Sequence, residues 1–370
     1  MSESEAMTEV KVAVLAGTGG VGKTTLSAAY ALKQALAGRR VLVLTIDPAR
    51  RLAQAMGIEP SAGNAQSIDL GPETSGSLDA AMLDARMTFD HIVQRFSPNP
   101  DIARRIINND FYRRAAGALG GSQEYMAMEA LLEAVESGRW DLVVLDTPPS
   151  QNAIDFLDAP GRMLAVLERG TLGWLITPAF DAARAGTRLF GKGGNALFRV
   201  FERLTGGDVL SGLSEFVTNF ADLLPGFKDR ARRVKQLLTS TNCDFLLVTA
   251  PRTASIEPAL RYAHELEERG HRLSFIIVNR CAPPVPDEGD IGAAAQLSKL
   301  LPILPEHILR RLHKALESLQ AERAERYRRQ SMAIDRLAEE LAPHTLLQLA
   351  ESPSPPHSLE ELVDLARRIP

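Results

Sequence analysis

A glycine-rich turn between an apolar strand and a helix constrains the fold of this 370-residue chain more than any other feature. An apolar run, Val10–Ala16, precedes it, and a helix-period segment beginning at Thr24 follows it. Glycines let backbone N–H groups wrap round a phosphate, and the next helix directs its positive dipole end at the same anion. A glycine turn that only joins a strand to a helix is the alternative, but the full spacing and both flanks favour a phosphate-binding P-loop. The loop comprises Gly17, Thr18, Gly19, Gly20, Val21, Gly22, Lys23, Thr24 and Thr25.

This loop predicts chemistry for individual side chains. Lys23 is expected to reach the β- and γ-phosphates of ATP, and the hydroxyl of Thr24 to ligate Mg²⁺. Two aspartates follow later strands, Asp47 in Ile46-Asp47-Pro48 and Asp146 in Leu145-Asp146-Thr147. Strand carboxyl ends gather at one sheet edge, so we expect Asp146 to assist Mg²⁺ binding and Asp47 to orient or deprotonate the attacking water. Alone, each aspartate would be better explained as a helix cap or a turn residue, but a P-loop on the same sheet edge favours the functional roles.

Short β-branched runs alternate with longer helix-period segments, which predicts a doubly wound, mostly parallel α/β sheet. The predicted strands are Val10–Ala16, Arg40–Ile46, Leu142–Asp146, Phe245–Ala250 and Ser274–Asn279. Two long stretches between strands have helical character and are too long for ordinary crossovers. The first includes Leu78–Arg95 and Gln123–Ser137, and the second covers Arg162–Ser240. We therefore expect one P-loop ATPase domain over residues 1–370, with helical insertions at about 78–138 and 161–240 that form a helical subdomain.

The C-terminal part predicts three further elements. A long charged helix spans Glu306–Leu341, and a short strand, His344–Leu349, follows it. Ser358 is predicted to cap a last helix that carries Glu360 and Glu361 in its first turn.

The composition argues against nucleic-acid binding and against a cysteine metal site. The 46 acidic and 42 basic residues nearly cancel, so no global field favours nucleic acid. The two cysteines, Cys243 and Cys281, form no CxxC pair and are expected at opposite ends of the sheet, which argues against a shared metal or metalloid site. The few cysteines, without paired spacings, fit a reducing compartment and predict a cytoplasmic protein, and the polar first residues and the absence of a long apolar run predict a soluble one.

Three motifs together resemble the ArsA/GET family, which comprises arsenite-pump ATPases and tail-anchored-protein targeting ATPases related to MinD and ParA. They are GGVGKTT at the P-loop, the turn Ile46-Asp47-Pro48-Ala49, and Asp146-Thr147-Pro148-Pro149. The resemblance extends over nearly the whole chain. It implies a two-fold dimer that closes on ATP and holds a client on a helical surface, and it implies that Asn279, with Arg280 beside it, reads the adenine. A turn asparagine at a strand end is the alternative for Asn279.

The chain departs from this family at Thr18, where members usually carry a signature lysine that reaches the partner's phosphates. Losing such a cation can cost on the order of 10³–10⁵ in rate. Hydrolysis as a homodimer is then slow, or another cation substitutes, or a sister subunit in a heterodimer supplies the lysine. The candidate substitutes are Arg50, Arg51 and Lys192.

The client region is ambiguous. Seven of thirteen phenylalanines lie between Phe180 and Phe227, with pairs at helical spacing such as Phe198 and Phe201. These faces pack on the protein itself or form a groove for a hydrophobic client. Methionines such as Met126 and Met128 lie elsewhere, which weakens the case for a tail-anchor client.

Three functions follow. The leading one is a dimeric Mg²⁺-dependent ATPase that couples nucleotide state to a conformational change serving a partner, a hydrophobic client or a membrane protein. The second is a nucleotide-gated chaperone or scaffold with weak hydrolysis, active beside a sister ATPase. The third, a MinD/ParA-like positioning ATPase, is disfavoured because the last helix, Leu359–Arg368, is short and carries acidic residues.

Overall fold

The computed structural model describes residues 11–46, 56, 65–109, 123–147, 157–161, 223–284, 305–352, 354, 356 and 358–369. Asp47 and most of the predicted 161–240 insertion therefore lie outside the described residues. Among the helices that are described, none is long and apolar enough to cross a membrane.

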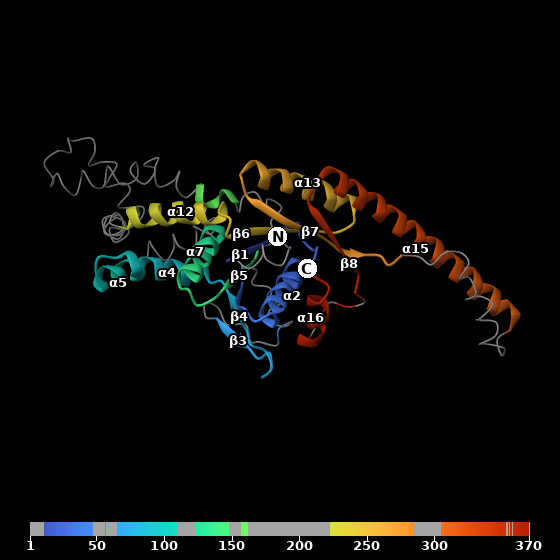
Figure 1. The fold of residues 1–370 in the computed structure, drawn as a ribbon, viewed down its shortest axis with the longest axis horizontal. Helices are drawn as coiled ribbons and strands as arrows, with labels where there is room; N and C mark the ends of the chain where they lie inside the picture. Colours follow the sequence, from blue (N-terminus) through green and yellow to red (C-terminus); the bar gives the residue numbers. More distant parts are fainter. Residues whose placement is uncertain are drawn as a thin grey trace, which may run out of the picture.

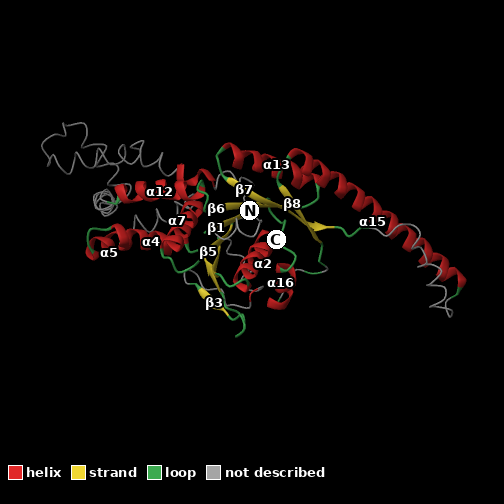
Figure 2. Cartoon of the chain, in the orientation of Figure 1, coloured by secondary structure: helices red, strands yellow, loops and turns green. Residues whose placement is uncertain are grey.

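An eight-stranded sheet forms the centre of the molecule, with helices on both faces (Figures 1 and 2). Its strand order is β3-β4-β2-β5-β1-β6-β7-β8, and every neighbouring pair is parallel except β3 with β4. The strands are β1 (Val12–Gly17), β2 (Arg40–Thr45), β3 (Gln66–Ile68), β4 (Ser77–Met82), β5 (Leu142–Asp146), β6 (Cys243–Thr249), β7 (Arg272–Cys281) and β8 (Thr345–Ala350). The predicted α/β class is confirmed.

Alternating side chains of the central strands supply two apolar layers. Val12 and Val14 of β1 pack on the face covered by α4, α5, α7, α12, α13 and α15, whereas Ala13 and Leu15 pack under α2 and α16. The helices are α2 (Lys23–Leu36), α4 (Ala85–Phe96), α5 (Pro100–Asn108), α7 (Gln123–Glu136), α12 (Leu224–Leu238), α13 (Thr253–Glu268), α15 (Glu306–Glu340) and α16 (Leu359–Ala366). Because the β1 residues are fully buried on both faces, the first strand lies in the middle of the core.

All five predicted strands are present, and so are the C-terminal elements. The predicted long helix is α15, the predicted strand is β8, and the backbone N–H of Glu361 donates to Ser358 Oγ at 3.3 Å at the start of α16. The two cysteines lie as expected, since Cys243 begins β6 and Cys281 ends the adjacent parallel strand β7. Both are free and buried, and burial raises the pKa of each thiol.

The prediction of helix across Leu78–Arg95 was wrong over its first residues. Residues Ser77–Met82 form β4, which pairs with β2, and helix begins only at Ala85. Leu78 and Ala80 point into the core while their neighbours are more exposed, so the segment buries alternate side chains on a sheet edge. The division into one domain with a helical subdomain stays a prediction.

Candidate functional site

The P-loop joins β1 to α2 at the carboxyl edge of the sheet, and two of its glycines fit only because they lack a side chain. Gly17 has φ +146°, and a Cβ there would lie 2.0 Å from the carbonyl oxygen of Val248 in β6. Gly22, the N-cap of α2, has φ +98°, and a Cβ there would lie 2.5 Å from Asn279 Nδ2. Positive φ requires glycine at both positions, together with a close backbone neighbour at Gly17 and a close side-chain neighbour at Gly22.

Lys23 is the first residue of α2 and folds back along the loop. Its ammonium donates to the carbonyl oxygens of Gly17, at 2.8 Å, and Thr18, at 3.0 Å, and the residue is only 6% exposed. A buried ammonium at a helix N-terminus, beside a loop of glycines, is arranged to hold an anion.

Asp146 ends β5 and is completely buried beside Lys23. Its carboxylate accepts hydrogen bonds from Thr45 Oγ1 at 3.0 Å and Ser27 Oγ at 3.4 Å, and the Thr24 hydroxyl lies close enough to lower its pKa. Burial raises the pKa of Asp146, against the lowering effect of these hydroxyls and of the Lys23 ammonium. The structure thus brings the predicted phosphate and Mg²⁺ residues together.

Thr45 and Ser27 were missed from the sequence as members of this cluster. Their positions in the sequence could have predicted their place beside Asp146. Ser27 lies one helical turn after Lys23, and Thr45 is the last residue of β2, in register with Asp146.

Asn279 and Arg280 lie near the end of β7, across from the P-loop. The side-chain amide of Asn279 donates to the Val21 carbonyl at 2.8 Å, and its oxygen accepts from the Arg280 backbone N–H at 2.9 Å. Arg280 has φ +63°, at an irregularity in the β7–β8 pairing. Asn279 therefore joins the P-loop to β7, and the predicted adenine contact remains a prediction.

Thr18 occupies the position that the resemblance assigns to a lysine. Its Oγ1 is buried and has no hydrogen-bond partner within the described part of the chain. The alternative cations Arg50, Arg51 and Lys192 lie outside the described residues, as does the predicted general base Asp47.

The donors at this edge fit Mg²⁺ held with a nucleotide. A threonine hydroxyl, Thr24, lies against a buried carboxylate, Asp146, and Mg²⁺ typically takes one or two such protein ligands plus phosphate oxygens. Within the described ranges there is no group of three or more His, Cys, Asp or Glu side chains that could hold a metal ion by itself.

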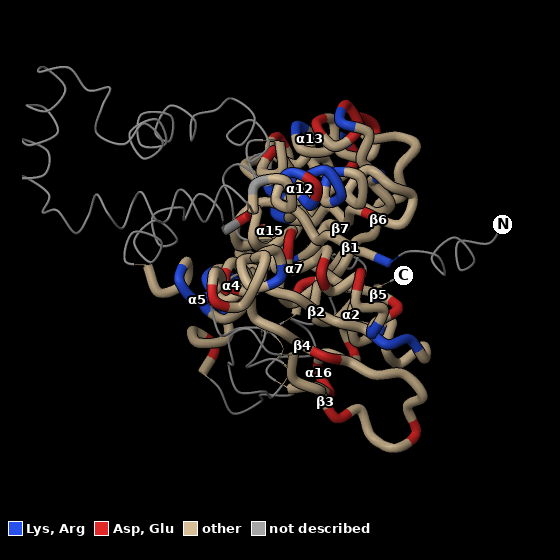
Figure 3. Tube along the Cα trace, turned by 90° about the vertical axis from the view of Figure 1, so that its left-hand side faces the viewer, with Lys and Arg blue, Asp and Glu red and all other residues tan. Residues whose placement is uncertain are grey.

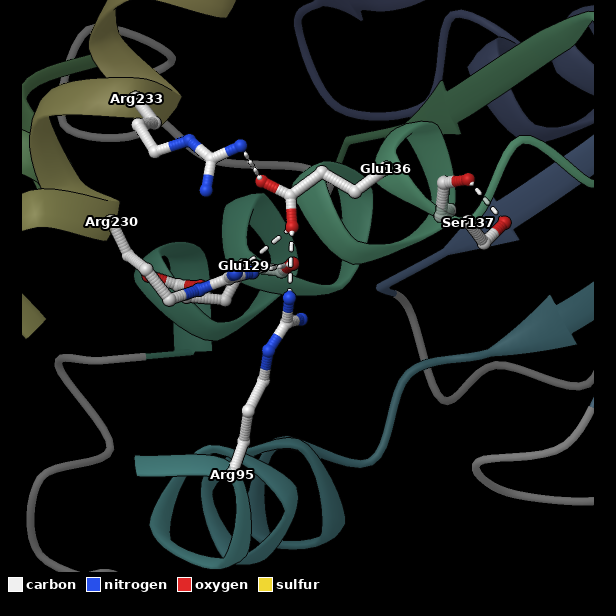
Figure 4. Close-up of polar contacts among 7 residues, drawn as sticks. Arg95, Glu129, Glu136, Ser137, Arg230 and Arg233 are labelled. Atoms are coloured by element: carbon white, nitrogen blue, oxygen red, sulfur yellow. Dashed lines mark hydrogen bonds and ion pairs between the residues drawn. The ribbon is translucent and has the colours of Figure 1, made fainter. Parts of the chain in front are cut away.

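A second buried carboxylate, Glu129, lies away from the P-loop on α7 and was not predicted (Figure 4). Arg230 of α12 donates through Nε to Glu129, and the Tyr125 hydroxyl donates to the same carboxylate. The Arg230 side chain is 3% exposed and that of Glu129 is 0% exposed. Burial raises the pKa of Glu129, while Arg230 and Tyr125 act in the opposite direction.

Glu136, one end of α7, gathers further cations around this pair. It contacts Arg230 at 3.2 Å, Arg233 at 2.7 Å and Arg95 of α4 at 3.5 Å (Figure 4). Basic residues concentrate along α12 (Figure 3). The helices α4, α7 and α12 are therefore joined by charge as well as by apolar packing.

The phenylalanine stretch is described only at its last member. Phe227 of α12 is 1% exposed and packs against Phe89 of α4, with ring centroids 5.6 Å apart. Met126 and Met128 of α7 are also buried. At these three positions the apolar side chains form core, while Trp174 and the other six phenylalanines lie outside the described residues.

Comparisons with known proteins identify relatives. The family model for anion-transporting ATPases, ArsA type, matches residues 10–296. Protein Rv2184c of Mycobacterium tuberculosis is 32% identical over 181 residues, which are 46% of this chain and 42% of the relative. ATPase GET3 of Malassezia globosa is 24% identical over 271 residues, 73% of this chain and 72% of the relative.

A third relative is longer than the shared part. A putative arsenical pump-driving ATPase of Halobacterium salinarum is 28% identical over 188 residues, 46% of this chain and 27% of the relative. The chain thus spans less than half of the mycobacterial relative and about a quarter of the halobacterial one.

Proposed function

Since the chain belongs to the ArsA family of anion-transporting ATPases, we propose that it binds Mg·ATP at the P-loop edge and hydrolyses it as a cytoplasmic, dimeric enzyme. The observation that carries this proposal is the convergence of Lys23, Thr24 and Asp146 at one sheet edge. The relatives named as ATPases support it.

In this proposal Lys23 moves from the loop carbonyls to the β- and γ-phosphates, whose negative charge is a stronger partner for an ammonium. The N–H groups of the glycine loop and the start of α2 hold the same phosphates. Thr24 would ligate Mg²⁺ and Asp146 would orient the ion's shell, and the ion would supply positive charge next to the transferred phosphoryl group. Asp47 orients the attacking water, and Asn279 with Arg280 lies beside the base.

ATP turnover then serves a partner. By analogy with the relatives named GET3, we infer that nucleotide state changes the arrangement of two subunits, and that the helical layer of α4, α7 and α12 presents a surface to a hydrophobic client or a membrane protein.

Thr18 favours a second candidate, a scaffold whose signal is nucleotide binding rather than turnover. Its buried hydroxyl offers no cation to a facing subunit. In a heterodimer, the lysine of a sister chain would reach the phosphates bound to this chain and restore hydrolysis there. The sister's own site would stay slow, because it faces Thr18.

Steady-state ATP hydrolysis tests the enzyme directly. Lys23→Ala should lower turnover by about 10²–10³-fold or more, since it removes a cation from the developing phosphate charge. The matched control is Lys235→Ala on the exposed face of α12, which should leave turnover unchanged. Equal turnover in Lys23→Ala and wild type contradicts the proposal.

Thr18→Lys separates the two candidates. In a homodimer the new lysine should raise turnover, because each subunit then supplies a cation to its partner. ATP binding by the wild type without measurable hydrolysis, unchanged by Thr18→Lys, favours the scaffold.

A further inference from the structure

A pocket of about 630 Å³ lies between the start of α13 and the middle of α15. One wall is formed by residues 251–253, which follow β6 at the carboxyl edge of the sheet, and the other by residues 318–330 of α15. Figure 1 shows α15 meeting α13 and then projecting away from the sheet. None of the residues that line the pocket belongs to the P-loop or to β5. The volume suits a small molecule rather than a single ion.

Gln330 is the most informative side chain of this pocket. It lines the pocket although the residue is only 7% exposed. Its Oε1 accepts a hydrogen bond from the backbone N–H of Ala282, directly after β7, at 2.7 Å. The amide nitrogen can donate two further hydrogen bonds and has no acceptor among the residues that the structure describes. Because buried polar groups are nearly always paired, these free N–H groups indicate that the pocket receives a hydrogen-bond acceptor.

Helix α13 begins at the same pocket with an uncapped N-terminus. Its N-cap residue, Arg252, makes no side-chain cap hydrogen bond, and the first turn of this 16-residue helix holds no acidic residue. The Arg252 carbonyl accepts from the backbone N–H groups of Ser255 and Ile256, whereas the N–H of Thr253 has no acceptor within the described ranges. Free N–H groups and the helix dipole give this wall of the pocket a positive character that favours an anion.

The charged side chains of the pocket leave one arginine available. Arg329 pairs with Glu325 at 2.8 Å, and Arg326 pairs with Glu351. Arg252 lines the pocket, is exposed, and forms no ion pair with a carboxylate of the described part of the chain. An unpaired guanidinium therefore lies next to the uncapped helix start.

We propose that this pocket binds a small metabolite through a phosphate group, held by Arg252, the Gln330 amide and the N–H of Thr253. Donors from two walls suit the three terminal oxygens of a phosphate monoester better than the two oxygens of a carboxylate. Glu322 of α15 also lines the pocket and has no cation beside it among the described residues. Its carboxylate accepts a hydrogen bond from a hydroxyl of the same molecule, so the ligand is a hydroxylated phosphate monoester.

This site is separate from the proposed ATP site and does not depend on it. Calorimetric titration of the full-length protein with glycerol 3-phosphate tests it. Binding should have the same affinity with and without a saturating non-hydrolysable analogue of Mg·ATP, because the analogue fills the P-loop and leaves the pocket open. Methyl phosphate should bind more weakly, since it has no hydroxyl for Glu322.

Two variants test the phosphate donors. Arg252→Ala should weaken the binding of glycerol 3-phosphate by about 10–100-fold, because it removes a charged donor. Arg261→Ala, also exposed on α13, is the matched control and should bind like the wild type. Gln330→Glu keeps an oxygen for the Ala282 N–H but replaces the free amide by an oxygen that repels phosphate, so binding should be lost at a similar thermal midpoint.

Glu322→Gln tests the opposite wall. It should reduce the preference for glycerol 3-phosphate over methyl phosphate, because a neutral amide is a weaker acceptor for the hydroxyl. An unchanged preference contradicts the hydroxylated class of ligand.

The inference is overturned if the wild type does not bind glycerol 3-phosphate, or if Arg252→Ala binds it as tightly as the wild type. Loss of binding in the presence of the ATP analogue also overturns it, because the pocket would then belong to the nucleotide site. Acetate that binds as tightly as methyl phosphate overturns the choice of phosphate. Absence of ATP turnover with intact binding of glycerol 3-phosphate counts against the proposed function alone.

Discussion

Asp146 and Glu129 are both fully buried carboxylates whose pKa burial raises, yet their surroundings differ. Asp146, at the sheet edge, accepts hydrogen bonds from the neutral hydroxyls of Thr45 and Ser27, and the nearby Lys23 ammonium, which lowers its pKa, donates to carbonyl oxygens of the P-loop. Glu129, between helices, faces the fixed guanidinium of Arg230. A buried carboxylate without a directly hydrogen-bonded cation costs stability, and a bound cation would lower that cost. The difference indicates a ligand site at Asp146 and a structural clamp at Glu129.

Removing Arg230, the cation of the Glu129–Arg230 clamp, should have the largest effect on unfolding free energy. Arg230→Met leaves Glu129 buried without its counter-charge, and breaking such a pair costs about 3–5 kcal/mol of unfolding free energy. Denaturant unfolding measures it. Arg233→Met removes a partly exposed contact to Glu136 and should cost at most about 1 kcal/mol.

The double variant Glu129→Gln with Arg230→Met should recover most of that loss, because no charge is then left unpaired. Glu136 keeps Arg95 and Arg233 as partners in this variant. A double variant as unstable as Arg230→Met alone contradicts the description of the pair as a clamp.

Asp146→Asn should lower ATP turnover without lowering the unfolding free energy, the opposite of what is expected for Arg230→Met. Turnover should fall by about 10²–10³-fold, because the carboxylate that orients Mg²⁺ is lost. Unfolding free energy should be unchanged or higher, since a neutral amide among hydroxyls avoids the cost of a buried charge. Turnover and unfolding free energy should be measured on the same preparation of the variant. A variant that is destabilised but fully active would mean that Asp146, like Glu129, has a structural role.

Two glycines of the P-loop test how closely the loop next to Asp146 packs against β7. Gly22→Ala combines positive φ with a clash against Asn279, and we expect a loss of stability of roughly 1–3 kcal/mol. Gly20→Ala shares positive φ but meets nothing within 4 Å, so its loss should be the smaller. Thermal unfolding of the two variants without nucleotide compares them, and equal losses would mean that the contact with Asn279 adds nothing.

The pH dependence is the smallest expected effect. A carboxyl whose folded-state pKa is raised contributes stability that is present below its unfolded pKa and lost as pH rises through the folded value. Wild type without nucleotide should therefore lose stability relative to Asp146→Asn as pH rises from about 4 toward neutrality. Urea midpoints across that range give the difference, and parallel curves would mean that Asp146 is not destabilised by burial.

Most of the sheet and the P-loop could be predicted because each depends on local sequence. The β1–loop–α2 unit, the five strands and the Ser358 cap all depend on residues that are neighbours in the chain. Strand β4 could not be predicted in this way. Its sequence, SLDAAM, has little β-propensity, and pairing with β2 decides its conformation.

The clamp was also beyond sequence reasoning. Glu129 and Arg230 are 101 positions apart, and each lies in a segment with other charged residues. Nothing local distinguishes them from solvent-exposed charges, so only the packing of α7 on α12 reveals the pair. By contrast, the triad Lys23, Thr24 and Asp146 could be predicted, because the ends of parallel strands always meet at one edge.

Calorimetric titration of Mg·ATP into three proteins tests the central contrast most directly. Wild type should bind with an affinity that depends on Mg²⁺. Asp146→Asn should stay folded and lose that dependence, while Glu129→Gln with Arg230→Met should keep it. A Mg²⁺ dependence that survives in Asp146→Asn and disappears in the clamp variant would contradict the account.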